Sequence, residues 1–166
     1  MRRAWIAWAA ASWAVISMAL MAHMAASEES SDEILLRLDN DAELFELDRA
    51  ALEALPQTRF ETETIWTEGK VAFSGPTLMS VLELAGLSGQ PVEATAVNAY
   101  KSTIPAEFIE KDVPIIATRM NGEAFGRRRN GPLWIVFPYD SERRFQRELI
   151  FSMSVWQLVR LQLADG

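Results

Sequence analysis

Residues 131–140 read GPLWIVFPYD and combine a rigid turn, an apolar run and a polar end. The glycine–proline pair fixes the turn into the segment, and Leu133 to Phe137 are apolar in succession. A run of this length predicts a strand that is covered on both faces, and therefore a central one. Tyr139 and Asp140 follow a proline at the end of this strand, where a loop can carry function.

Short strands and short helices flank this segment without a regular alternation. Strands are predicted at residues 34–38, 60–66, 71–73, 92–98 and 113–120, the last continuing into a hairpin after Asn121-Gly122. Helices are predicted over 49–55 after the cap Asp48, from Ser74-Gly75-Pro76 through Ala85, and as a turn over 105–109. The stretch 145–163 contains further strand-like segments. Because no βαβ repeat is present, the pattern favours an α+β domain with a mixed sheet.

The first 26 residues, MRRAWIAWAAASWAVISMALMAHMAA, are typical of a secretory signal peptide. Two arginines precede a long apolar run, and Ala26 suits the last position of a leader. Retention of this segment as a membrane anchor is the alternative, and both readings place the domain outside the cytoplasm. Residues 27–33 form a polar, acidic spacer. The domain itself is expected over residues 34–166.

The chain contains no cysteine, and its single histidine, His23, lies in the expected leader. The domain therefore offers neither a thiolate nor an imidazole. This excludes a Cys or His nucleophile, a His general base and a Cys/His metal site, so we assign no catalytic residue and no metal ligand. Loss of Arg2 and Arg3 with the leader would bring the net charge from −7 to −9. Such an acidic domain is a poor nucleic-acid binder.

Four segments, taken in order, resemble one protein family. They are TIWTEG at 64–69, AVNAY at 96–100, GPLWIVFPYD at 131–140 and SVWQL at 154–158. Together they resemble the oxidoreductase molybdopterin-binding domain, which has the sulfite-oxidase fold, over roughly residues 34–163. More narrowly, the chain resembles the small, exported, cysteine-free branch that includes periplasmic pterin-binding proteins of the PruR type.

The resemblance implies a pterin pocket that lacks a molybdenum centre. In the molybdenum enzymes of this fold one cysteine holds the metal, and no residue here supplies a thiolate. The narrower branch binds free reduced or oxidised pterins and acts with a membrane protein that makes and breaks cyclic di-GMP. The resemblance thus implies a non-enzymatic ligand sensor in the periplasm with a membrane-anchored signalling partner. One departure matters: the branch reads ALNDY where this chain has Ala99 in place of the aspartate.

A pterin is a flat bicyclic ring edged with donors and acceptors, so its site needs rings to stack on and fixed polar groups. Trp66 is a candidate ring at a strand end, with a core role as the alternative. Asn98 offers both a donor and an acceptor, and Tyr100 beside it presents a ring and a hydroxyl; packing at the edge of the core is the alternative for Tyr100.

The remaining candidates lie in or next to the central segment. Arg128 belongs to the basic run at 127–129, which is otherwise a solvated loop, and matches an arginine typical of the family. Trp134 is favoured as a core residue over a ligand contact. Tyr139 and Asp140 follow the strand, and Asp140 is a candidate to replace the missing carboxylate, with a turn-forming role as the alternative.

Three functions remain open at this stage. The first is the non-enzymatic pterin sensor. The second is a domain that has lost its ligand and acts only in protein contacts, a reading that Ala99 supports. The third is a pterin- or molybdopterin-dependent oxidoreductase, which would need unusual oxygen ligation of the metal or an organic pterin cofactor.

Overall fold

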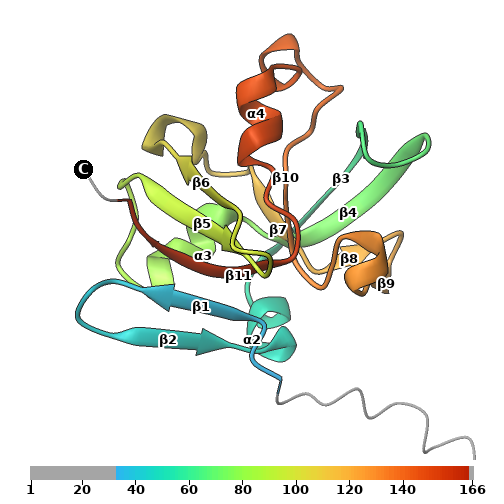
Figure 1. The fold of residues 1–166 in the computed structure, drawn as a ribbon. Helices are drawn as coiled ribbons and strands as arrows, with labels where there is room; N and C mark the ends of the chain where they lie inside the picture. Colours follow the sequence, from blue (N-terminus) through green and yellow to red (C-terminus); the bar gives the residue numbers. More distant parts are fainter. Residues whose placement is uncertain (1–32, 165–166) are drawn as a thin grey trace, which may run out of the picture. The chain divides into compact units, whose positions relative to one another are not determined.

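The computed structural model describes residues 33–164 (Figure 1). The expected leader, His23 and nearly all of the expected spacer lie outside the described residues. None of the helices described over this range is both long and apolar enough to cross a membrane. The strands and helices follow the order β1 (Leu36–Asp39), β2 (Leu44–Leu47), α2 (Arg49–Ala54), β3 (Gln57–Glu63), β4 (Lys70–Pro76), α3 (Leu78–Leu84), β5 (Val92–Ala96), β6 (Lys101–Ile104), η1 (Ala106–Phe108), β7 (Ile115–Ala117), β8 (Arg119–Met120), β9 (Glu123–Ala124), η2 (Arg127–Arg129), β10 (Trp134–Val136), η3 (Arg143–Phe145), α4 (Glu148–Met153) and β11 (Leu158–Leu163).

The strands form three sheets with mixed pairing, which confirms the predicted α+β class. The largest has the order β2-β1-β11-β5-β6, in which β1 and β11 are parallel and the other pairs antiparallel. A second sheet has the order β3-β4-β8-β9, and a third pairs β10 with β7. The parallel pair joins the two ends of the described chain.

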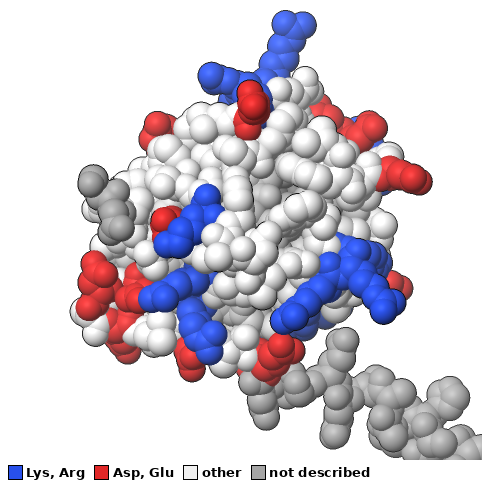
Figure 2. Space-filling model, in the orientation of Figure 1, with Lys and Arg blue, Asp and Glu red and all other residues white. Residues whose placement is uncertain are grey.

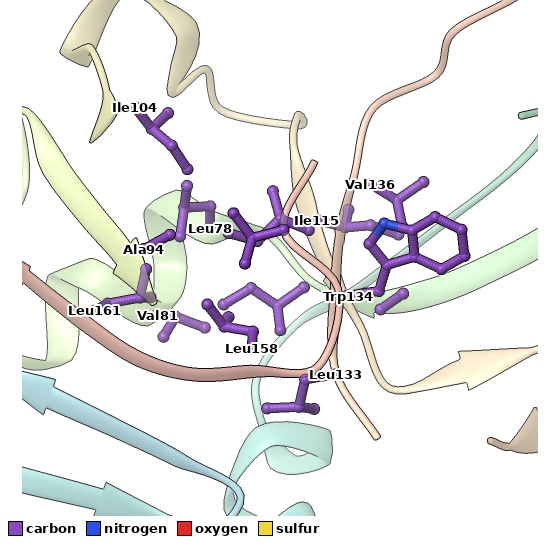
Figure 3. Close-up of a cluster of buried hydrophobic side chains, with 14 of the residues drawn as sticks. Leu78, Val81, Ala94, Ile104, Ile115, Leu133, Trp134, Val136, Leu158 and Leu161 are labelled. Atoms are coloured by element: carbon purple, nitrogen blue, oxygen red, sulfur yellow. The ribbon is translucent and has the colours of Figure 1, made fainter. Parts of the chain in front are cut away.

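The β10–β7 pair is the centre of the core, as the apolar run predicts. All six residues of these two strands are fully buried. The backbone of β10 also bonds to the chain before β11, since Ile135 N donates to Val155 O at 2.9 Å and Leu158 N donates to Leu133 O at 3.1 Å. Figure 3 shows the aliphatic side chains gathered beside these strands, with the Trp134 indole at one side of the cluster.

The helix caps follow the sequence rules, but one boundary was wrong. Asp48 caps α2 by accepting a hydrogen bond from Ala51 N at 2.7 Å, as predicted. Helix α3 begins only at Leu78, after the cap Thr77, because residues 74–76 are the last of strand β4. These residues pair with β3 as far as Gln57, and the ladder keeps them extended.

Other boundaries shift in ways that matter for the site. Strand β3 ends at Glu63, three residues before Trp66, so Trp66 lies in the β3–β4 loop rather than in a strand. Strand β5 ends at Ala96, which leaves Asn98 in a loop as well. The stretch 145–163 includes the helix α4, where a strand-like segment was predicted, because Ile150 and Met153 pack into the core at helical spacing. The hairpin at Asn121-Gly122 is confirmed as β8–β9.

Two glycines are fixed by close approach of the backbone. A Cβ on Gly75 would lie 1.9 Å from Ile116 O, where β4 packs against β7. A Cβ on Gly131 would lie 2.1 Å from Phe125 O and 2.7 Å from the Phe125 ring. Both contacts are far inside van der Waals distance, and both involve backbone atoms that cannot rotate away. Glycine is therefore required at each position.

Gly131→Ala should destabilise the domain by about 3 kcal/mol and lower its Tm by roughly 10 °C. The added methyl group would clash with Phe125 and distort the turn that leads into β10. Gly126→Ala is the matched control, since nothing lies within 4 Å of a Cβ there. Thermal unfolding by circular dichroism measures both. Equal melting temperatures for the two variants would contradict the close approach.

Asp140 links the end of β10 to the β3–β4 hairpin. Its carboxylate accepts a hydrogen bond from the buried Thr62 hydroxyl at 2.8 Å and pairs with Lys70 Nζ at 2.9 Å. The hydrogen bond from Lys70 is the largest cause that lowers the pKa of Asp140 below its ordinary value, and burial acts in the opposite direction. The folded state is therefore stabilised by the ionised form of Asp140.

Asp140→Asn should cost up to about 1 kcal/mol of stability at neutral pH, because it removes the charge while keeping an acceptor for Thr62. A carboxyl group with a lowered folded-state pKa stabilises the fold above its unfolded pKa of about 3.9. The difference from wild type should thus disappear as the pH falls through the folded-state pKa. Urea unfolding at several pH values measures it, with Glu68→Gln as an exposed control. A difference that persists at low pH would argue against the ion pair.

Candidate functional site

Two loops and the start of β11 meet at one residue, Gln157. Its backbone N–H donates to Asn130 O at 3.0 Å, and its side-chain Nε2 donates to Arg127 O at 3.1 Å. Its own carbonyl accepts from Val97 N at 3.0 Å. Gln157 thus holds η2 on one side and the β5–β6 loop on the other. Figure 1 shows this loop beside the start of β11.

Each of these three segments has a non-glycine residue in the left-handed region. The φ angles are 65° at Ala99, 67° at Asn130 and 51° at Gln157. Asparagine tolerates this conformation, but alanine and glutamine adopt it at a cost of order 1 kcal/mol or more. Such strain persists only where the surrounding structure enforces it, and it gathers at functional sites. This meeting point is therefore the candidate site.

Aromatic rings lie around Trp66, which belongs to the β3–β4 loop. The centroid of its ring is 5.7 Å from that of Trp134, 6.1 Å from Tyr139, 5.9 Å from Phe151 and 6.1 Å from Trp156. The interplanar angles range from 50° to 88°, so the contacts are tilted or edge-to-face. This geometry is favoured between aromatic quadrupoles.

The aromatic cluster is joined to the strained loops. The Tyr100 hydroxyl donates to Ser152 O at 2.8 Å, next to Phe151 on α4. Trp156 directly precedes Gln157 and forms an isolated β-bridge with Trp134. Trp156 is 36% exposed and Tyr100 43% exposed, while Trp66 and Phe151 are half-buried. We call these four residues, Trp66, Tyr100, Phe151 and Trp156, the aromatic patch.

Positive charge lies next to the patch, on η2. Arg127, Arg128 and Arg129 are all exposed, and none takes part in the ion pairs found between described residues. In Figure 2 the basic side chains at the right lie over the segment that contains η2, beside a broad area without charged side chains. A flat, polar-edged ligand would find rings and guanidinium groups at adjacent positions here.

Two of the predicted site residues are buried beneath the patch. Trp134 is fully buried and contacts the aliphatic core, the role favoured for it from sequence. Tyr139 is 3% exposed, and its hydroxyl donates to Ser154 Oγ at 2.7 Å. Burial raises the pKa of Tyr139 well above its ordinary value, so this phenol stays neutral. Its ring contacts Trp66 at an interplanar angle of 67°.

The other predicted residues take different places. Asn98 is exposed, and its Oδ1 accepts a hydrogen bond from Tyr100 N at 3.1 Å, which leaves the amide Nδ2 as a donor for a ligand. The Asp140 carboxylate contacts Thr62 and Lys70 and so stabilises the fold. A contact between Asp140 and a ligand stays a prediction. Trp66, Tyr100 and Arg128 lie in or beside the patch.

Sequence reasoning missed Gln157 and Phe151. Gln157 stands in the segment SVWQL, but only its hydrogen bonds and its positive φ reveal how it connects two distant loops. Phe151 was not considered because residues 145–163 were predicted to be strand-like. The helical spacing of the apolar residues Ile150 and Met153 could have predicted helix α4, which carries Phe151.

The residues present do not fit a thiolate-bound molybdenum. The chain has no cysteine, and the described part of it holds no group of three His, Cys, Asp or Glu side chains placed for a metal. They do fit the organic ring of a pterin. Among the described residues, the buried Trp134 Nε1 also lacks a hydrogen-bond acceptor.

Comparison with known proteins identifies a matching family and a similar fold. The family model described as "Oxidoreductase molybdopterin binding domain" matches residues 48–141. Among solved structures, the sulfane dehydrogenase SoxCD from Paracoccus pantotrophus matches with a TM-score of 0.62 at 20% identity. That match covers 84% of this chain but only 40% of the SoxCD chain, so it shows a shared fold. No curated protein sequence matches.

The family match spans more than half of the chain and includes the β3–β4 loop, the β5–β6 loop, η2 and β10. The chain therefore belongs to the oxidoreductase molybdopterin-binding domain family.

Proposed function

We propose that this domain binds a pterin at the aromatic patch, without molybdenum, and catalyses no reaction. One observation carries the proposal: partly exposed aromatic rings, the strained loops and the η2 arginines lie next to one another. These arginines form no ion pair with another described residue, and the chain contains no cysteine. The rings offer a stacking surface for the bicyclic ligand. Arg128 supplies a guanidinium that stacks on the ring or donates to its carbonyl oxygen, and Asn98 Nδ2 donates to its edge.

The wider role we propose is that of a periplasmic ligand sensor. The basis is the signal-like leader and the resemblance to the exported pterin-binding branch. A pterin bound at the patch would change the surface formed by the β5–β6 loop and η2. A membrane-anchored signalling protein with a periplasmic domain, of the type that makes and breaks cyclic di-GMP, would respond to that change.

A second candidate function rests on Ala99. Where the resembled branch has aspartate, this side chain cannot accept a hydrogen bond from a pterin amino group. Ala99 holds a left-handed conformation that aspartate tolerates better. The β5–β6 loop thus adopts a conformation that suits aspartate, although the side chain there is alanine. A domain that has lost its ligand and serves only protein contacts would show this combination.

Protein isolated from the periplasm should carry a fluorescent pterin and no molybdenum. Mass spectrometry of the released ligand and elemental analysis measure the two separately. Protein free of pterin, whose melting temperature does not change on addition of tetrahydrobiopterin, would contradict the sensor and favour the protein-contact function. Molybdenum in stoichiometric amount would contradict both and favour an oxidoreductase.

Arg128→Ala and Tyr100→Ala should each weaken pterin binding about tenfold or more, because each removes a group that contacts the ring. Isothermal titration with biopterin measures the change. Arg143→Ala, an exposed arginine on η3, is the control for loss of charge, and Tyr100→Phe keeps the ring while removing the bond to Ser152 O. Unchanged affinity in both alanine variants would remove these residues from the site.

Ala99→Asp should strengthen pterin binding by about tenfold, because it restores a charged acceptor for the amino group at a position where aspartate is conformationally suited. Ala99→Gly is the matched control, since it relieves the strained φ without adding a carboxylate. If the two variants bind biopterin equally, the gain comes from loop conformation and the proposed contact is wrong.

A further inference from the structure

A hydrogen-bond donor without an acceptor lies beneath the aromatic patch. The Trp134 side chain is fully buried, and its Nε1 has no partner among the described residues. A buried indole N–H normally finds an acceptor, and leaving a buried donor unpaired is costly. An unpaired donor directly under a ligand-binding surface suggests that the ligand supplies the acceptor.

Two rings contact the Trp134 indole. Phe73 lies 5.4 Å away at 80° and is fully buried, whereas Trp66 lies 5.7 Å away at 71° and is partly exposed. An N–H that faces an aromatic ring makes a weaker bond than one to a carbonyl oxygen. Displacement of Trp66, rather than of Phe73, would open Trp134 to a ligand from solvent.

Trp66 itself fills a place of defined size. Its indole is bounded by four rings, those of Trp134, Tyr139, Phe151 and Trp156, at centroid distances of 5.7 to 6.1 Å. An indole and a pterin are both flat bicyclic systems of similar extent. The pterin differs in carrying a carbonyl oxygen on its edge, which is the acceptor that Trp134 Nε1 lacks.

The loop that carries Trp66 is held by local contacts. The β3–β4 ladder ends at Glu63 and Lys70. Within the loop, Trp66 N donates to Thr64 Oγ1 at 3.0 Å, and the Thr64 and Thr67 hydroxyls share a hydrogen bond. The neighbouring Ile65 is 67% exposed. Rotation of Trp66 outward would thus leave the sheet intact.

We propose that Trp66 is an intramolecular placeholder for the ligand. It occupies the pterin slot in the unliganded domain, and a bound pterin displaces it and accepts a hydrogen bond from Trp134 Nε1 through its ring carbonyl. This inference rests on the proposed pterin binding and changes the role of one ring in it. Trp66 becomes the side chain that competes for the slot, the other rings of the aromatic patch remain the stacking surface, and Trp134 Nε1 is the donor at the base of the slot.

The donor is tested with Trp134→Phe, which removes the N–H and keeps an apolar ring. Biopterin affinity, measured by isothermal titration, should fall about tenfold. Phe73→Leu is the matched control, because it loosens packing on the same indole without removing the donor, and it should bind within about twofold of wild type. Equal losses in the two variants would mean that packing, and not the donor, matters.

A spectroscopic measurement on the wild-type protein tests the donor without altering the packing of the core. In ¹⁵N-labelled wild-type protein, the indole N–H resonance of Trp134 is identified by its absence from the Trp134→Phe spectrum. It should move downfield on addition of biopterin, as expected for a new hydrogen bond to oxygen. A resonance that stays in place at saturating biopterin would overturn the assignment.

The competitor is tested with Trp66→Ala. If Trp66 occupies the slot, its removal should tighten biopterin binding about tenfold, because the ligand no longer competes with an indole. Ile65→Ala, in the same loop, should leave the affinity unchanged. Weaker binding by Trp66→Ala would show that Trp66 supports the ligand and would overturn the placeholder.

The outcomes separate this inference from the proposed function. Wild-type protein that binds biopterin, combined with weaker binding by Trp66→Ala and a fixed Trp134 resonance, contradicts only the placeholder. Wild-type protein that binds no biopterin contradicts the proposed function, and the placeholder falls with it.

Discussion

Strand β10 can enter the core only because the backbone passes through a gap too narrow for a side chain. At Gly131 the chain lies against Phe125 O, and at Gly75 the neighbouring strand lies against Ile116 O. These contacts bring β10, β7 and β4 close enough for apolar side chains to fill the space between the three sheets. In a domain without disulfides, this packing and the hydrogen bonds of β10 supply the stability.

The site depends on that packing in a direct way. Trp134 is the first residue of β10, and the bond from Leu158 N to Leu133 O fixes the start of β11 beside it. Gln157 then has a defined position from which it holds η2 and the β5–β6 loop. The strained backbone at Ala99, Asn130 and Gln157 is tolerated because these bonds enforce it.

Much of the fold could be predicted from the sequence, because its signals are local or follow from burial. The apolar run at 133–137, the cap at Asp48 and the turn at Asn121-Gly122 each indicated the element that forms. The short strands β2 and β6 and the helix α4 were not predicted, because their formation depends on the partners that they pack against.

The candidate site was predictable in composition but not in arrangement. Trp66, Tyr100 and Arg128 were identified as residue types that suit a flat, polar ligand, and the structure places them in or beside one patch. Asp140 was a candidate ligand group with a turn-forming role as the alternative, and its contacts are with Thr62 and Lys70, which lie 70 or more residues earlier in the chain. Neither those contacts nor the role of Gln157 could follow from spacing, since both join segments distant in sequence.

The way Gln157 holds its two loops has a consequence for how such domains diverge. Its partners are the backbone carbonyls of Arg127 and Asn130 and the backbone N–H of Val97. None of these bonds involves a side chain of η2 or of the β5–β6 loop. A mutation at Arg128 can therefore change the surface chemistry of η2 while Gln157 keeps η2 in place, whereas Asn98 also holds the β5–β6 loop through its bond to Tyr100 N. The side chains of η2 are thus free to diverge between relatives without loss of the backbone contacts that hold this segment on β11.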